Sequence, residues 1–303
     1  MRYVRVMLDG FRERRIATGA AELFVTVGGA GPPLVCLHGY PQSHLTWRKV
    51  APLLAERYTV VLPDLRGYGA SEIVASDDAH LNYSKRTMAR DIVALMAQLG
   101  YERFLLAGHD RGARVAYRLA LDAPERVAAL AVLDIIPTLE NWEAMDYKRA
   151  YGAYHWPFLA QPAPLPEKLI GSDPAWYCAQ QIGTWLEDRS AADDDVLAAY
   201  CAAFSRPGAV HAMCEDYRAG YTCDIDHDRT DRDAGKRIAM PMLALWGAGR
   251  DGKRSAHFPA VWERWASDFR GAGLPCGHFL MEELPGETAA ALGGFFDANV
   301  ARL

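Results

Sequence analysis

The sequence lacks the features that mark secreted, membrane-spanning and zinc-cluster proteins. None of its cysteines forms a CxxC pair, a pattern that fits reduced thiols better than a disulfide framework or a zinc site. No apolar run approaches the roughly 20 residues that cross a bilayer, and residues 1–5 include no apolar core of a secretory signal. The six cysteines stand at positions 36, 178, 201, 214, 223 and 276. We therefore expect a cytoplasmic protein without a membrane partner.

A strong charge of either sign is also missing. The net charge is −5 over 303 residues, so nothing in the composition attracts nucleic acid. Half of the residues are hydrophobic, and a chain of this length can bury a large core. There are no internal repeats and no low-complexity segments. Together these properties predict one globular domain, with room for an insertion.

Short apolar runs alternate with helix-like segments along both ends of the chain, and this alternation predicts an α/β fold with a mostly parallel, doubly wound sheet. The expected strands are 21–27, 33–37, 58–62, 104–107, 127–133, 242–246 and 268–274. The expected helices are 45–55, 84–99, 113–120, 258–267 and 286–299, with Ser84 as an N-cap.

The alternation stops after Ile136 and resumes near residue 240. Between these points the sequence is rich in aromatic residues and helix-like pieces, and several prolines interrupt its first half. We expect a core domain formed by residues 1–136 and 240–303, with residues 137–239 inserted as a helical cap.

The segment Gly108-His109-Asp110-Arg111-Gly112 joins an expected strand to an expected helix. A strand, a G-x-nucleophile-x-G turn and a helix make a nucleophile elbow, in which the glycines allow a strained turn that exposes the central side chain. Here that side chain is a carboxylate. Acyl transfer to a carboxylate gives a labile anhydride, whereas displacement at an sp³ carbon leaves an ordinary ester. The elbow thus predicts alkyl transfer to Asp110 followed by hydrolysis; the alternative is a polar surface turn.

Candidate partners of Asp110 follow other strands, where the ligand sites of open α/β sheets gather. Among nine histidines, His278 alone fits the chain order nucleophile, acid, histidine, and we expect it to be the base that activates water. The acid is either Asp134, which ends its strand directly, or Asp251, which lies in a later loop; we favour Asp134. Backbone N–H groups of Tyr40 and Arg111 are the expected oxyanion donors.

Arg111 and Arg114 lie one helical turn apart at the start of a helix that the sequence predicts to be buried. Buried arginines need an anionic partner, because an unpaired buried charge is costly. A substrate carboxylate held by both guanidinium groups supplies one. For Arg114, a salt bridge to a core acid is the alternative.

Four motifs together resemble the dehalogenase and epoxide-hydrolase branch of the α/β-hydrolase superfamily, and more narrowly the fluoroacetate (haloacetate) dehalogenases over essentially the whole chain. They are H-G-Y-P at 38–41, D-L-R-G-Y-G at 64–69, G-H-D-R-G at 108–112 and G-H-F at 277–279. The resemblance implies an α/β-hydrolase fold with a helical cap and hydrolysis of a small haloacid to glycolate and halide. It supports Asp134 as the acid and Arg111 and Arg114 as carboxylate ligands.

The resemblance further implies a halide pocket formed by His155, Trp156 and Tyr217, no metal or organic cofactor, and a homodimer. Indole, phenol and imidazole groups can replace the hydration of a departing fluoride. Ordinary cap packing is the alternative for Trp156 and Tyr217. Tyr40 departs from the family pattern, in which phenylalanine is common after His-Gly, and its hydroxyl would narrow or polarise the pocket.

Two other functions remain open at this point. Epoxide hydrolysis uses the same aspartate, histidine and acid, with cap tyrosines as proton donors, and the cap has seven tyrosines. A neutral epoxide, however, gives the two arginines nothing to pair with. A non-catalytic receptor for a small carboxylate is the second alternative, against which the intact nucleophile, acid and base argue.

Overall fold

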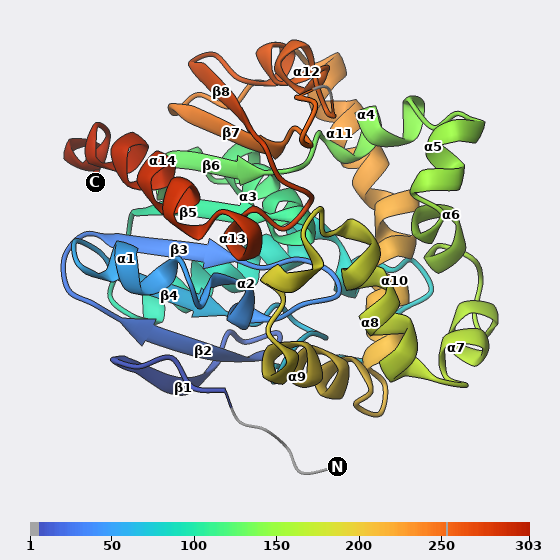
Figure 1. Cartoon of the computed structure of the whole chain (residues 1–303). Coiled ribbons are helices and arrows are strands. Elements are labelled where there is room, and N and C mark those ends of the chain that lie inside the picture. The colour runs from blue at the N-terminus through green and yellow to red at the C-terminus, as the bar shows by residue number, and fades with distance from the viewer. Residues whose placement is uncertain (1–5, 253) are drawn as a thin grey trace.

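The computed structural model describes residues 6–252 and 254–303, so the expectation about the N-terminal residues 1–5 falls outside it. An eight-stranded sheet runs through the molecule in the order β1-β2-β4-β3-β5-β6-β7-β8 (Figure 1). Strand β2 pairs antiparallel with β1 and β4, and the other neighbours are parallel. The strands are β1 (Phe11–Ala17), β2 (Glu22–Gly28), β3 (Pro33–Leu37), β4 (Thr59–Pro63), β5 (Phe104–His109), β6 (Val127–Leu133), β7 (Met242–Gly247) and β8 (Phe269–Leu274).

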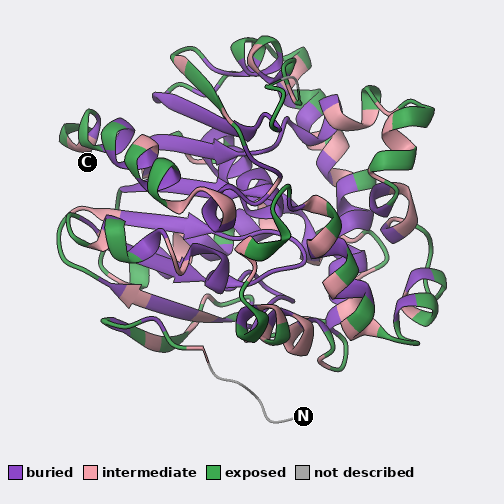
Figure 2. Ribbon diagram, in the orientation of Figure 1, coloured by how far each residue is buried: buried purple, intermediate pink, exposed green. Residues whose placement is uncertain are grey.

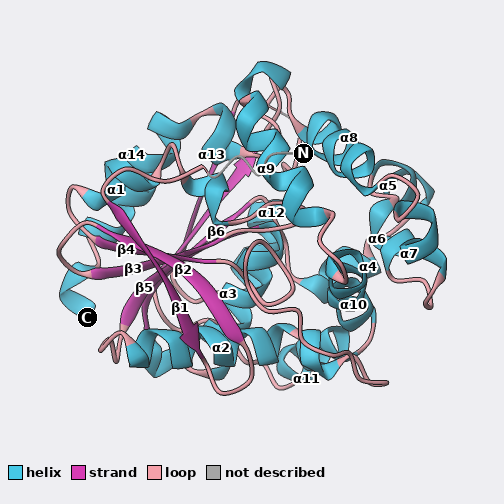
Figure 3. Ribbon diagram, turned by 90° about the horizontal axis from the view of Figure 1, so that it is seen from below, coloured by secondary structure: helices cyan, strands magenta, loops and turns pink. Residues whose placement is uncertain are grey.

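Helices cover both faces of this sheet, which confirms the doubly wound α/β architecture. The helices α1 and α14 lie on one face, and α2 and α3 lie on the other (Figures 1 and 3). The core helices are α1 (Ala51–Ala55), α2 (Lys85–Gln98), α3 (Asp110–Asp122), α12 (Phe258–Trp265), α13 (Leu280–Glu283) and α14 (Pro285–Asp297). Ser84 caps α2 as predicted, because its hydroxyl accepts a hydrogen bond from the Thr87 N–H.

The central strands carry the hydrophobic core. Every residue of β5, β6 and β7 is buried, as expected for parallel strands covered on both faces (Figure 2). The first strand, β1, was not predicted. Its sequence, FRERRIA, is mostly charged, which an edge strand tolerates because one face and one edge meet water. A search for apolar runs therefore misses such a strand, because most of its residues are charged.

Residues 137–239 are helical throughout their regular structure, and they lie beyond the carboxyl ends of the strands (Figure 1). Their helices are α4 (Thr138–Glu143), α5 (Tyr147–Gly152), α6 (His155–Leu159), α7 (Leu165–Ile170), α8 (Pro174–Trp185), α9 (Asp194–Phe204), α10 (Ala209–Tyr221) and α11 (Cys223–Asp233). We call this layer the roof, and we call the strand ends beneath it the floor.

One predicted helix is wrong in its length. The segment 45–55 divides into a 3₁₀ turn, His44–Trp47, and the short helix α1. Pro52 stands in the first turn of α1 and has no N–H to donate to the preceding turn, so a continuous helix cannot form there.

Candidate active site

The elbow forms as the sequence predicts, with β5 ending at His109 and α3 beginning at Asp110. Asp110 has φ = +47°, a strained conformation for a residue other than glycine. The flanking glycines make the turn sterically feasible. A Cβ on Gly112 would lie 2.2 Å from the His38 carbonyl oxygen, and one on Gly108 would lie 2.6 Å from the Gly112 carbonyl oxygen. Asp110 is thus fixed at the floor by its backbone.

The Asp110 carboxylate is held between a backbone donor and an imidazole. Its Oδ1 accepts a hydrogen bond of 2.8 Å from the Tyr40 N–H, and its Oδ2 lies 3.8 Å from His278 Nε2. Burial raises the pKa of this carboxyl, but the neighbouring His278, His109 and Arg111 outweigh it, so the pKa of Asp110 lies below its ordinary value. The carboxylate is therefore ionised, the state that a nucleophile requires.

The predicted oxyanion donors lie close to this carboxylate. A Cβ on Gly39 would lie 2.5 Å from Asp110 Cβ and 2.9 Å from Arg111 N, so only glycine permits this approach. The Tyr40 side chain, which we expected to shape the pocket, is fully buried, and its ring packs against Tyr217 with centroids 5.3 Å apart.

Of the two acids that the sequence left open, Asp134 contacts the histidine. Asp134 follows β6 and accepts a hydrogen bond of 2.6 Å from His278 Nδ1. Its carboxylate also accepts from the Gly247 N–H at 2.9 Å and from Arg254 at 3.2 Å. Asp251, by contrast, is exposed in the loop after β7. Like Asp110, Asp134 has a positive φ, +54°.

The loop that carries His278 is held by groups that had no expected role, although His109 stands in the G-H-D-R-G motif. His109 donates from Nε2 to the His278 carbonyl oxygen at 2.8 Å, and the two rings lie 4.6 Å apart. His109 is fully buried and its Nδ1 has no partner among the described residues, which fits an imidazole protonated on Nε2 alone. From the roof, the Trp185 carbonyl oxygen accepts a hydrogen bond of 2.9 Å from the His278 N–H.

The two arginines have different surroundings. Arg111 Nε and Nη2 donate to the Asp216 carboxylate of α10 at 3.0 and 2.7 Å, and Nη1 alone has no partner among the residues that the structure describes. A core acid was the alternative partner expected for Arg114, but the structure places one beside Arg111. The reason is that α10 brings Asp216 over the start of α3, a long-range contact that helical spacing does not reveal.

Arg114 has no carboxylate partner among the described residues. Its Nη1 donates to the Ile136 carbonyl oxygen at 2.9 Å and to Thr138 Oγ1 at 3.2 Å, and its Nε makes no hydrogen bond. Burial, followed by the charge of Arg111, lowers the pKa of Arg114. A buried guanidinium in such a place is a ready site for an anion.

The three expected halide ligands come together beneath the roof. His155 and Trp156 lie on α6 and Tyr217 lies on α10, and the Tyr217 ring is 5.7 Å from the His155 ring and 5.8 Å from the Trp156 ring. The His155 Nδ1 is buried and has no partner in the described part of the chain, and burial lowers the pKa of this histidine to about 3. His155 is therefore neutral at ordinary pH and can donate one hydrogen bond without carrying charge.

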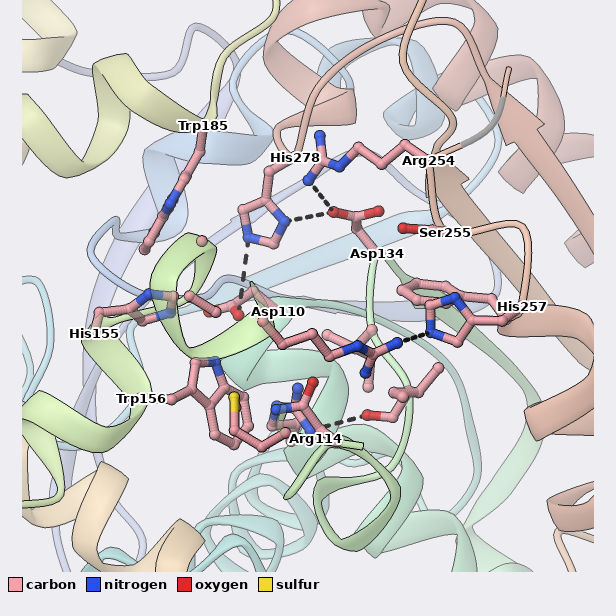
Figure 4. Close-up of a pocket in the computed structure, with 18 residues that line it drawn as sticks. Asp110, Arg114, Asp134, His155, Trp156, Trp185, Arg254, Ser255, His257 and His278 are labelled. Atoms are coloured by element: carbon pink, nitrogen blue, oxygen red, sulfur yellow. Dashed lines mark hydrogen bonds and ion pairs between the residues drawn. The ribbon is translucent and has the colours of Figure 1, made fainter. Parts of the chain in front are cut away.

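A cavity of about 360 Å³ opens above Asp110 (Figure 4). Asp110, Arg114, Asp134, His155, Trp156 and His278 line it, whereas Tyr40, Arg111 and Tyr217 lie behind the lining. Trp185 also lines it and packs against both histidines, with ring centroids 4.6 Å from His155 and 5.5 Å from His278. The aromatic-rich roof sequence offers no signal that distinguishes Trp185 from its neighbours. Within the described ranges, no cluster of side chains suited to a metal ion is present.

Comparisons with known proteins identify the fold and the family of the chain. A family profile described as the alpha/beta hydrolase fold matches residues 32–179. The chain is 43% identical to the fluoroacetate dehalogenase of a Burkholderia species over 95% of each chain. It is 32% identical to the soluble epoxide hydrolase of Corynebacterium sp. (strain C12), covering 93% of this chain and 92% of that one. The crystal structure of ALR0039 from Nostoc sp. PCC 7120 superposes with a TM-score of 0.93 at 48% identity, covering 96% and 99% of the two chains.

The fold, the elbow and these relatives define the class of the protein as an α/β hydrolase. Within that superfamily the chain belongs to the family of the fluoroacetate and haloacetate dehalogenases. It is therefore a hydrolase with a small-molecule substrate. In the part of the chain that the structure describes, no helix is both long and apolar enough to span a bilayer.

Proposed function

We propose that the protein hydrolyses haloacetates, fluoroacetate among them, to glycolate and halide through an ester on Asp110. The observation that carries this proposal is Arg114, a buried guanidinium without an acidic partner that lines the same cavity as an ionised aspartate. A carboxylate bound there would satisfy Arg114 and hold its α-carbon beside Asp110. The unpartnered Nη1 of Arg111 is a second donor for the same carboxylate.

The first step forms the ester. Because Oδ1 of Asp110 is bonded to the Tyr40 N–H, Oδ2 is the oxygen free to attack the α-carbon. A bond forms between Oδ2 and that carbon while the carbon–halogen bond breaks and the halide leaves with its electron pair. His155, Trp156 and Tyr217 receive the halide, replacing its hydration with N–H and O–H donors.

The second step returns the enzyme to its initial state. His278, held by Asp134, takes a proton from water, and the hydroxide formed attacks the Asp110 carbonyl carbon. The N–H groups of Tyr40 and Arg111 stabilise the oxyanion until the ester bond breaks. Overall, haloacetate and water give glycolate, halide and one proton. The glycolate carries away Oδ2 of Asp110, and the oxygen atom of the water replaces it in the carboxylate. No metal or organic cofactor takes part in this scheme.

Epoxide hydrolysis is the second candidate, since a relative of that activity matches most of the chain. That reaction uses tyrosine hydroxyls as proton donors; no tyrosine is among the described residues that line the cavity, and Tyr217, which lies behind the lining, is available to either reaction. Tyr147, Tyr151 and Tyr221 of the roof are exposed. The positive charge of Arg114 also favours an anionic substrate over a neutral one.

Halide release from fluoroacetate, chloroacetate and bromoacetate tests the proposal, with Asp110→Asn as the inactive control. A single turnover in ¹⁸O-labelled water adds a test of the intermediate, because the label should enter Asp110. Absence of the label from Asp110 would exclude the ester route. Turnover of styrene oxide without any halide release would favour the epoxide hydrolase instead.

A further inference from the structure

The cavity above Asp110 is larger than a haloacetate requires. Its volume of about 360 Å³ lies within the range of roughly 300–1,000 Å³ that holds drug-sized ligands. Beyond Asp110 and Arg114 it is lined by Arg149 of α5 and by Arg254 and His257 of the segment between β7 and α12. Arg254 and His257 lie on the side of the cavity opposite Trp185 and His155 (Figure 4).

Arg149 carries a charge that no acid of the described ranges compensates. Its Nη2 donates to His257 Nε2 at 2.8 Å, which joins the roof to the core. Arg149 is half-buried and His257 is exposed, so this bond lies in the outer part of the cavity. Among the described residues, no carboxylate forms an ion pair with Arg149. Arginine stays protonated at all ordinary pH values, and His257 must be neutral at Nε2 to accept this bond. The imidazole therefore orients the guanidinium without neutralising it.

Arg254 adds a second cation to the same outer part. Its guanidinium reaches the Asp134 carboxylate at 3.2 Å, but Asp134 also accepts from His278 and from the Gly247 N–H. The Arg254 side chain is 40% exposed, so N–H groups not used on Asp134 remain accessible. Arg114 thus stands at the inner end of the cavity and two further arginines stand at its outer end. Among the described residues, a monocarboxylate bound to Arg114 leaves Arg149 without an anion and Arg254 paired only with Asp134.

We propose that Arg149 and Arg254 form an outer anion site, with Arg149 oriented by His257, for the distal carboxylate of an α-halogenated dicarboxylic acid. This inference rests on the proposed function and extends its substrate class. Arg114 holds the carboxylate next to the carbon–halogen bond, and the second carboxylate extends toward the outer arginines. The chemistry at Asp110 is unchanged: halide leaves, one water is consumed, one proton is released and a hydroxy-dicarboxylate forms.

Binding measurements test the outer site without turnover. The Asp110→Asn variant is titrated with acetate, propionate, succinate and glutarate, with quenching of Trp156 and Trp185 fluorescence as the signal. We expect one of the dicarboxylates to bind about tenfold more tightly than either monocarboxylate, as one added charge-assisted contact provides. Adding Arg149→Gln should remove that advantage. Adding Arg250→Gln should preserve it, because Arg250 is a neighbouring exposed arginine that does not line the cavity.

Turnover supplies the second test. We compare kcat/KM for 2-chlorosuccinate and 2-chloroglutarate with that for 2-chloropropionate, which matches their α-substitution. In Arg149→Gln the ratio of dicarboxylate to monocarboxylate should fall about tenfold. An equal fall for both substrate classes would overturn the proposal, because it would mean that Arg149 only attracts anions in general. Equal binding of mono- and dicarboxylates by the parent Asp110→Asn variant would also overturn it.

Two further readouts keep these outcomes distinct. Thermal unfolding of Arg149→Gln shows whether the fold is intact, and Arg149→Lys, which keeps the charge, should restore part of the dicarboxylate preference. If chloroacetate and the chlorinated dicarboxylates are not hydrolysed, the proposed function fails. The binding titrations of the Asp110→Asn variants would then decide whether the outer site exists.

Discussion

Asp110 and Asp134 in the floor have left-handed backbone angles, whereas His155, Trp156 and Tyr217 in the roof belong to ordinary helices. A non-glycine residue in such a conformation costs on the order of 1–3 kcal/mol, so the floor keeps its geometry only because buried strands hold it on both sides. The roof residues are placed by packing of helices against helices. Under the proposed function the floor carries out the reaction, while the roof, together with Arg114 of α3, selects the substrate.

The largest effect should come from the floor. Replacing Asp110 by Asn removes the nucleophile and should lower the rate of halide release by about 10⁴-fold or more. Steady-state fluoride and chloride assays measure it. Retention of a tenth of the activity would mean that another group attacks carbon and that the floor does not perform the first step.

The next largest loss of activity should come from removing the acid that pairs with His278. Asp134→Asn should lower kcat by about 10³- to 10⁴-fold, because His278 loses the partner that orients it. Asp251→Asn is the matched control and should stay close to the parent enzyme. Since ester formation does not need His278, the Asp134 variant should release one equivalent of halide and retain an ester on Asp110, which mass spectrometry of the peptide detects. A loss confined to the Asp251 variant would reverse the assignment.

A third prediction concerns the joint between roof and floor. Asp216 of α10 pairs with Arg111 and Lys85 of the core, and all three side chains are buried. Asp216→Asn removes the acid of the buried Arg111 and leaves Lys85 with Asp224 alone, 3.6 Å away, so it should lower the free energy of unfolding by about 3–5 kcal/mol. Urea unfolding at neutral pH measures the loss. A loss below about 1 kcal/mol, as for an exposed pair, would show that the Asp216 ion pairs contribute little to holding the roof on the core.

The same pair has a defined pH dependence. Burial raises the pKa of the Asp216 carboxyl, but Arg111 and Lys85 more than reverse this and hold the pKa well below its usual range. A carboxyl with a lowered pKa in the folded state contributes stability that is fully present above its unfolded pKa and is lost as pH falls toward the folded value. Parental stability should therefore decline below about pH 4, and the decline should be smaller in Asp216→Asn.

The charge of Arg114 is expected to make the cavity selective for carboxylate substrates. Arg114→Gln keeps much of the side-chain volume but removes the charge, and kcat/KM for chloroacetate should fall by about 10²-fold. Arg114→Lys should recover part of this loss. An unchanged kcat/KM in Arg114→Gln would assign carboxylate binding to Arg111 Nη1 alone.

The smallest effect should come from His109, which holds the His278 loop through one hydrogen bond. His109→Leu should slow ester hydrolysis by about tenfold while leaving the first halide burst nearly intact. His109→Gln, which keeps an N–H donor, should restore much of the rate. An equal slowing of both steps would mean that His109 supports the fold and not the position of His278.

The features that the sequence could predict lie mainly in the floor. The sheet, the elbow and the juxtaposition of Asp110, Asp134 and His278 follow from apolar runs and from the rule that sites gather at strand ends. The edge strand β1 was not predicted because its residues are mostly charged. The pairs Arg111–Asp216 and Arg149–His257 were not predicted, because each joins helices or loops that are distant in the chain. No local sequence pattern indicates which helices pack against each other.

The bond from the His278 N–H to the Trp185 carbonyl oxygen ties the roof to the second step of the proposed cycle. It attaches the loop of the proposed base to the last residue of α8, so the roof supports the histidine that activates water. The first step needs the roof as well, because His155, Trp156 and Tyr217 are the proposed halide ligands. A change that loosens the roof should therefore slow both ester formation and ester hydrolysis.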